Sequence, residues 1–290
     1  MKVAIFGIQG QLGRDLESAL AGFEIIPMLY EQVDVTRADQ VEAAVAAAHP
    51  QWIINSAAMT HVDRCETEAS EAFGVNALGA LHVARASASV GARLLFVSTD
   101  YVFDGEKGAP YVENDPPRPI NVYGVTKLAG EWFVRQACSE HYIVRTSGLY
   151  GLHPCWGKGT NFVETMLRLA AERDELRVVA DEVLTPTFTE DLAAQIRRMM
   201  EAAPPFGVYH ATNEGQCSWY EFAAEIFRLS GASVKLSPIA SSQWKAAARR
   251  PSNSVLENAA LKAASLNVFP EWKDALARYL HSRGRLHVRA

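Results

Sequence analysis

The sequence has no excess of basic residues. It contains 28 Lys and Arg residues against 33 Asp and Glu residues, which gives a formal net charge of -5 at pH 7 and a pI near 5.9. Nucleic acids and anionic membranes bind proteins through clustered positive charge, and no run of basic residues provides such a cluster. We therefore expect neither nucleic acid nor a membrane as a partner.

Long apolar runs and closely spaced cysteines are absent as well. No stretch approaches the roughly 20 apolar residues that cross a bilayer, and the first apolar run ends at Gly7, too early for a signal peptide. The four cysteines, Cys65, Cys138, Cys155 and Cys217, form no C-x-x-C pair, so we expect reduced thiols and no zinc site. These absences predict a cytoplasmic protein.

Short β-branched runs alternate with longer helical patterns through the first half of the chain. The strand candidates cover residues 3–6, 24–29, 52–55, 94–98 and 142–145, and the helical patterns cover residues 11–20, 37–48, 68–90 and 122–139. Thr36, followed at the third position by Asp39, is expected to start the second helix. This alternation is typical of βαβ units and predicts an α/β fold with a doubly wound, Rossmann-type parallel sheet.

The pattern changes after about Gly151. Helical patterns at 161–172, 189–202 and 218–229 surround strand candidates at 207–211 and 234–236. Ser218 and Glu221 form a predicted capping box for the last of these helices. We predict a Rossmann domain over residues 1–150 and a smaller mixed α/β lobe over residues 151–290, from which some segments return to the first domain.

A glycine-rich segment lies between the first strand and the first helix. It reads Gly7-Ile8-Gln9-Gly10-Gln11-Leu12-Gly13, and its G-x-x-G-x-x-G spacing departs from the G-x-G-x-x-G dinucleotide fingerprint. Backbone amides and the helix dipole at this position can bind a pyrophosphate. The alternative is a glycine turn that only packs helix against strand. Its place in the first βαβ unit favours a dinucleotide-binding domain.

The second strand candidate ends in Leu29-Tyr30-Glu31, where dinucleotide folds distinguish a ribose hydroxyl from a 2′-phosphate. No Arg or Lys lies there, and Glu31 would repel a phosphate. The sequence therefore favours NADH over NADPH, although Arg37 or a residue distant in sequence could reverse this preference. A solvated acid at a strand end is the alternative interpretation of Glu31.

Three polar residues suggest ketone reduction. Tyr123 and Lys127 are spaced i and i+4, so both project from one face of the predicted helix. A nearby ammonium lowers the pKa of a tyrosine from about 10, which suits proton donation to a ketone oxygen. Thr99 follows the fourth strand candidate and would donate a hydrogen bond to that oxygen. The alternatives are that Tyr123 and Lys127 form an ordinary pair on the helix surface, and that the Thr99 hydroxyl only stabilises a turn.

Longer stretches around these residues resemble a known family. Residues 98–105 read Ser-Thr-Asp-Tyr-Val-Phe-Asp-Gly, and residues 121–131 read Asn-Val-Tyr-Gly-Val-Thr-Lys-Leu-Ala-Gly-Glu. They resemble the extended short-chain dehydrogenase/reductase family and, within it, the dTDP-4-dehydrorhamnose reductases. Tyr101 matches these reductases, whereas related dehydratases usually carry an acidic residue there. The similarity covers essentially the whole chain.

The resemblance implies an NAD(P)H-dependent enzyme that reduces the C4 ketone of a nucleotide-linked 4-keto-6-deoxy sugar, from dTDP-4-dehydrorhamnose to dTDP-L-rhamnose. It implies that Thr99, Tyr123 and Lys127 are catalytic and that Lys127 also holds the nicotinamide ribose. Further residues implied to contact the dinucleotide are Gly7, Gln9, Gly10, Gln11, Leu12, Asp34, Val35, Ala57 and Ala58. Those implied to contact substrate, partly in a substrate-binding lobe, are Val62, Asp100, Tyr101, Phe103, Asn161, Phe162, Pro186, Thr187 and Arg250.

The chain departs from the family pattern where the sugar is expected. Gly148 replaces a bulky aromatic residue, Leu184 replaces a glycine, and a longer loop carries Trp156, which could refill the space at Gly148. A reductase of a different 4-keto sugar is therefore one alternative function, and a non-catalytic NAD(P)-binding regulatory subunit is another. The sequence is compatible with a monomer or a homodimer.

Some family members are magnesium-bridged dimers. Asp15 and Glu190 match two of the expected ligands, but no Asp or Glu follows Asp274 to supply the third. The sequence therefore predicts no structural metal.

Overall fold

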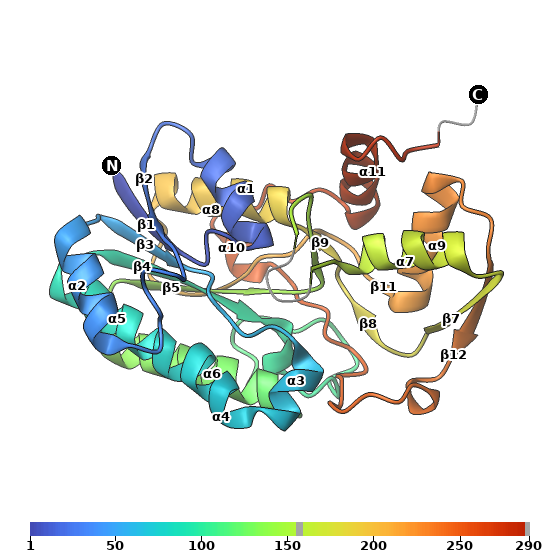
Figure 1. The fold of residues 1–290 in the computed structure, drawn as a ribbon, viewed down its shortest axis with the longest axis horizontal. Helices are drawn as coiled ribbons and strands as arrows, with labels where there is room; N and C mark the ends of the chain where they lie inside the picture. The colour runs from blue at the N-terminus through green and yellow to red at the C-terminus, as the bar shows by residue number, and fades with distance from the viewer. Residues whose placement is uncertain (155–158, 288–290) are drawn as a thin grey trace.

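The chain folds into a large parallel sheet with helices on both faces, beside a smaller mixed part (Figure 1). The structure is a computed structural model and describes residues 1–154 and 159–287. The sheet has six strands in the order β10-β5-β4-β3-β1-β2, all parallel. They are β1 (Lys2–Phe6), β2 (Glu24–Met28), β3 (Trp52–Asn55), β4 (Arg93–Thr99), β5 (His141–Thr146) and β10 (Gly207–His210). The predicted doubly wound α/β fold is confirmed.

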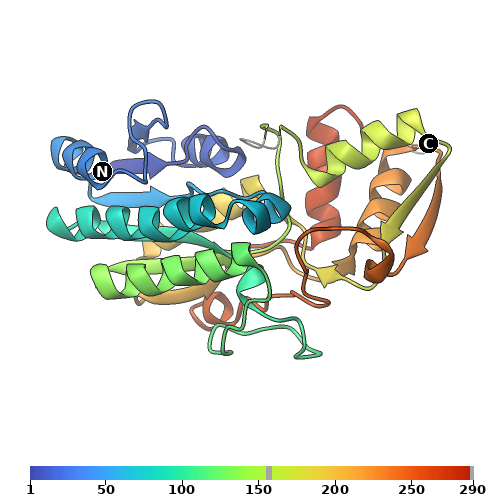
Figure 2. The ribbon, with the colours of Figure 1, turned by 60° about the horizontal axis from the view of Figure 1, so that its bottom comes forward.

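Helices cover both faces of the sheet, which explains why its strands are apolar at successive positions. In β1, Val3 and Ile5 pack in the layer of α1 (Gln11–Ala19) and α8 (Thr189–Ala202). Ala4 and Phe6 pack in the opposite layer. That layer contains α2 (Ala38–Ala48), α5 (Gly79–Ser89) and α6 (Val122–Ala137), and Figure 2 shows α5 and α6 running side by side. A strand that is buried on both faces reads as a continuous apolar run.

The predicted helix over 68–90 is built from several pieces. After α3 (Val62–Thr67), the chain forms α4 (Ala69–Phe73), a π-helical turn η1 (Gly74–Leu78) and α5 without a break. Inside the π turn, the Asn76 amide donates to Met59 O at 3.1 Å and to Thr126 Oγ1 at 3.0 Å. The widened turn therefore connects the segment after β3 to helix α6.

The smaller part has a mainly aromatic and aliphatic core. Tyr150 and Phe188 stack at 5.6 Å between ring centroids, and Tyr279 meets both rings edge-on. Its helices are α7 (Phe162–Glu172), α9 (Trp219–Ser230) and α11 (Trp272–Ser282), and its paired strands are β7 (Glu175–Val179) with β12 (Lys235–Ile239), β6 (Leu149–Tyr150) with β9 (Thr187–Phe188), and β8 (Val183–Leu184) with β11 (Cys217–Ser218). Short helical segments are η2 (Asp100–Val102), η3 (Ser241–Gln243) and α10 (Ala259–Ala263).

Two local predictions have different outcomes. The capping box is confirmed, because Glu221 N donates to Ser218 Oγ at 3.1 Å and Ser218 N donates to the Glu221 carboxylate at 2.7 Å. The predicted start of the second helix at Thr36 is wrong. The Thr36 hydroxyl donates to Asp34 at 2.9 Å, and α2 begins at Ala38 with Arg37 as its N-cap.

Strand β10 and helix α8 lie beyond residue 150 in sequence but belong to the large sheet and its helical layer. The chain therefore returns to the first part after entering the second. Cys65, Cys138 and Cys217 are buried, while Cys155 lies outside the described residues. Among the helices of the described ranges, none has the length and apolar character needed to span a bilayer.

Candidate active site

The glycine-rich turn between β1 and α1 holds backbone close to backbone. Gly7 has φ of +80°, and a Cβ at this position would lie 2.7 Å from Ala57 N. A Cβ at Gly13 would lie 2.3 Å from Gly7 O. Gly10 is the N-cap of α1, and within the described residues the cap has no side-chain hydrogen bond. The turn thus presents uncapped amides beside Ala57, which suits a pyrophosphate.

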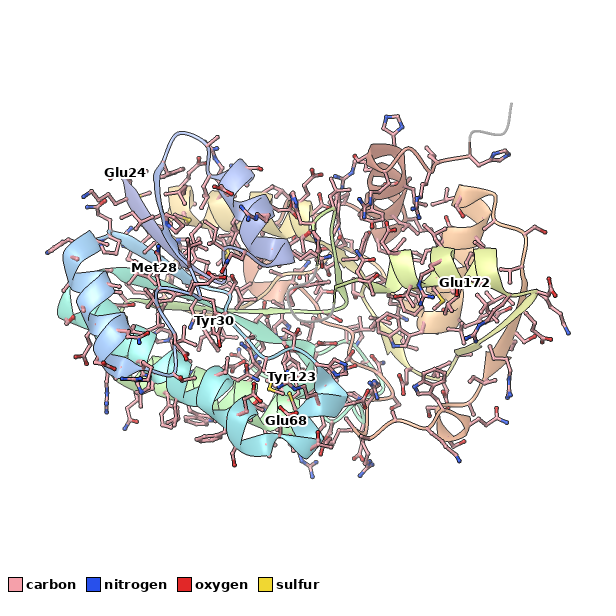
Figure 3. All side chains as sticks on the ribbon, viewed as in Figure 1. Glu24, Met28, Tyr30, Glu68, Tyr123 and Glu172 are labelled. Atoms are coloured by element: carbon pink, nitrogen blue, oxygen red, sulfur yellow. The ribbon has the colours of Figure 1, made fainter. Side chains whose placement is uncertain are left out.

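Glu31 is an exposed carboxylate beside this turn. Gln9 Nε2 donates to both Glu31 oxygens at 3.1 and 3.0 Å, and Gln9 Oε1 accepts from Tyr30 N at 3.1 Å. Figure 3 labels Tyr30, just beyond the end of β2. Asp34 lies nearby in sequence and accepts from Thr36 N at 2.9 Å. Negative charge is therefore held at the end of β2.

Some of the predicted dinucleotide contacts are limited to backbone atoms. The side chains of Leu12 and Val35 are buried in the two opposite core layers. The buried Gln11 amide donates to Gly151 O at 3.3 Å and His153 O at 2.9 Å. In this structure Gln11 therefore joins the glycine-rich turn to the segment that follows β6.

Thr99 ends β4 at the carboxyl edge of the sheet. Its buried hydroxyl donates to Asp100 Oδ1 at 2.9 Å and accepts from Tyr101 N at 3.2 Å. Asp100 Oδ2 in turn accepts from Ser147 Oγ at 2.8 Å, and burial raises the pKa of Asp100. Thr99 is thus held in place by polar contacts at the sheet edge where ligands bind in open α/β folds.

Tyr123 lies in the first turn of α6, close to the turn after β4. Asn121 caps this helix by accepting from Gly124 N at 2.7 Å. A Cβ at Gly124 would lie 2.1 Å from Tyr101 O, so helix and turn are in direct contact. The rings of Tyr101 and Tyr123 meet edge-to-face at 6.0 Å. Figure 3 shows Tyr123 at the end of the sheet part that is nearer to the smaller part.

Lys127 follows one turn later and is buried. Its Nζ donates to Val97 O at 2.7 Å and lies 4.1 Å from the centre of the Phe96 ring. Burial lowers the pKa of Lys127 to about 7, while the negative charge of Glu131 acts in the opposite direction. The structure therefore brings Thr99, Tyr123 and Lys127 to the β4–α6 contact at one edge of the sheet.

The motif around Lys127 contains a further residue to which the sequence analysis gave no role. Glu131 is completely buried and accepts from Ser98 Oγ at 2.7 Å and from Arg145 Nε at 2.8 Å. The available signal was its spacing, because a Glu four residues after Lys127 lies on the same helix face. Arg145, inside an apolar strand run, is the matching signal for a buried partner.

Among the predicted substrate residues, some lie around Tyr123. Tyr101 contacts its ring, and burial raises the pKa of Tyr101. Arg250 Nη2 pairs with Asp63 Oδ2 at 2.9 Å, next to Val62 at the start of α3. The Arg250 guanidinium is therefore near this edge but already has a carboxylate partner.

Phe103 does not contact this edge as an exposed ring. It is fully buried and stacks on Tyr111 with 4.1 Å between ring centroids, while the Arg145 guanidinium lies 5.1 Å from its centre. The ring therefore packs in the core and stabilises the segment that follows β4. The sequence predicted that the Phe103 side chain contacts the substrate, but in this structure the side chain is buried in the core.

Four predicted substrate residues have structural contacts in the smaller part. Asn161 caps α7 by accepting from Glu164 N at 3.0 Å, and Phe162 stacks on Phe222 at 5.5 Å. Pro186 and Thr187 are buried, and the Thr187 hydroxyl donates to Thr185 O at 3.3 Å. These contacts hold the four residues within the smaller part.

The two departures from the family pattern lie next to each other. Gly148 has φ of +55°, and a Cβ there would lie 2.7 Å from Leu184 Cδ1. Leu184 is buried in β8. The side chain gained at position 184 therefore occupies the space beside the side chain lost at position 148. Trp156, which was expected to refill this space, lies outside the described residues.

Asp15 and Glu190, the two residues considered as metal ligands, lie near each other. The Thr189 hydroxyl donates to Asp15, and His153 Nε2 lies 3.6 Å from Asp15 Oδ1. Burial raises the pKa of both carboxyls. Within residues 1–154 and 159–287, no group of three or more His, Cys, Asp or Glu residues is arranged to hold a metal ion.

Comparison with known proteins adds independent information. The family model of the RmlD substrate binding domain matches residues 1–284. The spore coat polysaccharide biosynthesis protein SpsK of Bacillus subtilis (strain 168) is 38% identical over 284 residues, which cover 97% of this chain and 98% of that protein. The dTDP-4-dehydrorhamnose reductase of Streptomyces griseus is 41% identical over 280 residues, which cover 94% of this chain and 90% of that protein.

A solved structure agrees with these relatives. The dTDP-4-dehydrorhamnose reductase from Bacillus anthracis str. Ames, crystallised in complex with NADP, has a TM-score of 0.93 at 40% identity and covers 97% of this chain and 99% of its own. The chain therefore belongs to the RmlD substrate binding domain family, and the resemblance to dTDP-4-dehydrorhamnose reductases that its motifs indicate is confirmed along nearly its whole length.

Proposed function

We propose that this protein is an NAD(P)H-dependent reductase that converts dTDP-4-dehydrorhamnose to dTDP-L-rhamnose by reducing the ketone at C4. The observation that carries the proposal is the meeting of Thr99, at the end of β4, with Tyr123 and Lys127 in the first turns of α6. The Streptomyces griseus and Bacillus anthracis relatives, both named as dTDP-4-dehydrorhamnose reductases, support the same reaction.

The residues present fit a nicotinamide dinucleotide. Uncapped amides at the start of α1 suit a pyrophosphate, and Gly7 allows the turn that carries them to pack directly against the backbone at Ala57. When bound, the cofactor supplies a hydride. The exposed carboxylate of Glu31 favours NADH, whereas the NADP in the Bacillus anthracis relative favours NADPH. Gln9, Gly10, Asp34 and Ala58 complete the proposed cofactor contacts.

The protein's own residues deliver the proton. As C4 accepts hydride, its oxygen gains negative charge, and the Tyr123 hydroxyl donates its proton to that oxygen. Thr99 Oγ1, which donates to Asp100 in this structure, turns to donate a hydrogen bond to the same oxygen. The Lys127 ammonium stabilises the phenolate that remains on Tyr123. The products are then a neutral alcohol and an oxidised nicotinamide, which is a cation, while Tyr123 is left as a phenolate that must regain a proton before the next turnover.

A reductase of a different 4-keto sugar nucleotide is the second candidate. The contact between Gly148 and Leu184 favours it, because the family's bulky residue is absent and a buried leucine takes the adjoining space. In both cases the nucleotide half of the substrate contacts Arg250. Its planar guanidinium suits a diphosphate, which would replace Asp63 as the partner of the guanidinium. The cytoplasmic location and the monomeric or homodimeric state remain predictions.

The experiment is an assay of NADH and NADPH oxidation by the purified protein with a panel of dTDP-linked 4-keto-6-deoxy sugars, with each product identified by NMR. Fastest turnover with dTDP-4-dehydrorhamnose is the expected result. A clear preference for another 4-keto sugar supports the second candidate. Binding of NADH without oxidation by any member of the panel would make the protein a non-catalytic subunit and overturn the proposal.

A further inference from the structure

Glu131 is a completely buried carboxylate one turn beyond Lys127. It forms a two-point contact with Arg145, from Nε to Oε1 at 2.8 Å and from Nη2 to Oε2 at 2.7 Å. Ser98 Oγ donates to the same Oε1 at 2.7 Å. Such charge-assisted, bidentate contacts are among the strongest and most directional in proteins.

These contacts join three elements at the proposed active edge. Ser98 immediately precedes Thr99 in β4, and Arg145 lies in β5 two residues before Ser147, which bonds Asp100. Glu131 itself lies on α6 with Tyr123 and Lys127. A single carboxylate therefore fixes the strand that carries Thr99 and the neighbouring strand against the helix that carries the other two residues.

The same carboxylate also controls the charge around Lys127. Glu131 acts electrostatically on Lys127 and itself contacts Arg135 on α6 and Arg145 on β5. Tyr123 lies one turn before Lys127 on α6, and Asp100 directly follows β4. Asp100 is fully buried, and burial raises its pKa, which weakens its value as a counter-charge. Arg145 is a second buried cation, and Glu131 is the carboxylate that pairs with it.

We propose that Glu131 is a positioning residue for catalysis: it holds β4 and β5 on α6 so that Thr99, Tyr123 and Lys127 keep their mutual placement, and it supplies the negative charge that keeps Lys127 protonated. The proposal rests on the proposed reductase function for its kinetic readout. Its electrostatic readout, the titration of Lys127, needs no substrate. The proposed function and the proposed role of Glu131 can therefore fail separately. If the wild-type protein shows no turnover, the function fails while the titration of Lys127 still reports on Glu131.

The first test is Glu131→Gln, which keeps the size of the side chain and removes its charge. NMR of protein with 13C-labelled lysine follows the titration of Lys127, whose signal is assigned by its loss in Lys127→Met. The variant is expected to lower the pKa of Lys127 by about one unit or more, because it removes the negative charge that opposes the effect of burial on Lys127. In the kinetic assay, the pH at which kcat begins to fall is expected to decrease by a similar number of units, with KM changed less than threefold.

Arg135→Gln is the matched control. Arg135 Nη2 reaches the same carboxylate only at 3.5 Å, and its side chain is 31% exposed, so this variant leaves the pKa of Lys127 and kcat unchanged. Ser98→Ala separates positioning from charge: it removes one hydrogen bond, and it is expected to lower kcat several-fold while the titration of Lys127 stays that of the wild type.

Two results overturn the proposal. One is a folded Glu131→Gln protein in which Lys127 titrates as in the wild type. The other is wild-type kcat in Ser98→Ala. If the charge left on Arg145 prevents Glu131→Gln from folding, the double variant Glu131→Met with Arg145→Met removes both buried charges, a replacement that folded proteins often tolerate. Its Lys127 must have a lower pKa than Lys127 in Arg145→Met alone, and an equal titration in these two variants overturns the charge role in that background as well.

Discussion

The edge of the sheet at Thr99 and the turn at Gly148 lie at the ends of the neighbouring strands β4 and β5, yet they are built differently. The edge is built on buried charge, with Lys127, Glu131 and Arg145 all removed from solvent. The turn is built on shape: Gly148 adopts a positive φ, and Leu184 fills the adjoining space. One region depends on hydrogen-bond partners and the other on volume.

This difference separates chemistry from recognition. A buried polar network tolerates little change, because a lost partner leaves a charge without compensation. A packed apolar contact tolerates exchange when the total volume is kept. We therefore expect the reaction type to be shared with the reductase relatives and the sugar preference to be the property that differs in this protein.

The largest expected effect is that of Tyr123→Phe. The variant keeps the ring contact with Tyr101 and loses only the proton donor, so kcat should fall by about a hundredfold or more. Steady-state NADPH oxidation and a fluorescence titration of cofactor binding measure the two properties separately. An unchanged kcat would remove Tyr123 from the mechanism, and a large loss of cofactor affinity would assign it a binding role instead.

Gly148→Trp tests the shape of the turn. The new side chain meets Leu184 at 2.7 Å and requires a positive φ, so the free energy of unfolding should fall by about 2–4 kcal/mol. Adding Leu184→Gly should restore part of that loss, because it removes the clash. Urea denaturation of both single variants and the double variant measures the coupling. If the two changes are simply additive, positions 148 and 184 do not compensate each other.

Lys127→Met tests how much the buried ammonium group lowers the free energy of unfolding. The pKa of Lys127 is about 7 in the folded chain and near 10.5 when unfolded, so the unfolded state binds more protons between pH 7 and 10. Wild-type stability should therefore rise relative to the variant across this window, by about 1.4 kcal/mol per pH unit at most. Thermal melts of both proteins at several pH values measure it. Parallel curves would contradict the lowered pKa.

Ser218→Ala should have the smallest effect. The capping box at α9 lies in the smaller part, away from the charged network, so its loss should lower the free energy of unfolding by about 1 kcal/mol. Because no proposed site residue contacts Ser218 in the described ranges, kcat should be unchanged. A clear fall in kcat would show that the two parts are more tightly coupled than their contacts indicate.

The sequence predicted most of the first part because its signals are local. The strands of the parallel sheet are apolar on both faces, and 52–55 and 189–202 coincide with β3 and α8. Strand β7 was missed because Glu175 and Arg177 interrupt its apolar pattern, and it is stabilised by pairing with β12, some 60 residues away. Pairing between distant segments leaves no local signal.

The same reasoning explains the site. Tyr123 and Lys127 share a helix turn, so their spacing was sufficient to predict their common face. Phe103 was expected at the substrate because of its place in a motif, but the ring stacks on Tyr111 in the core. The contact between Gly148 and Leu184 joins residues that are 36 positions apart in the numbering, and nothing in either local sequence indicates it.

The most direct test of the central claim is a double-variant cycle of Thr99→Val and Tyr123→Phe, measured as kcat for reduction of dTDP-4-dehydrorhamnose with NADPH. Both hydroxyls are proposed to act on the same ketone oxygen, so each variant should be slow. If the two fold-losses in kcat simply multiplied, they would give an expected kcat for the double variant. The measured kcat should be at least about tenfold higher than that value. Effects that multiply in full would contradict the account, because they would mean that Thr99 and Tyr123 act independently.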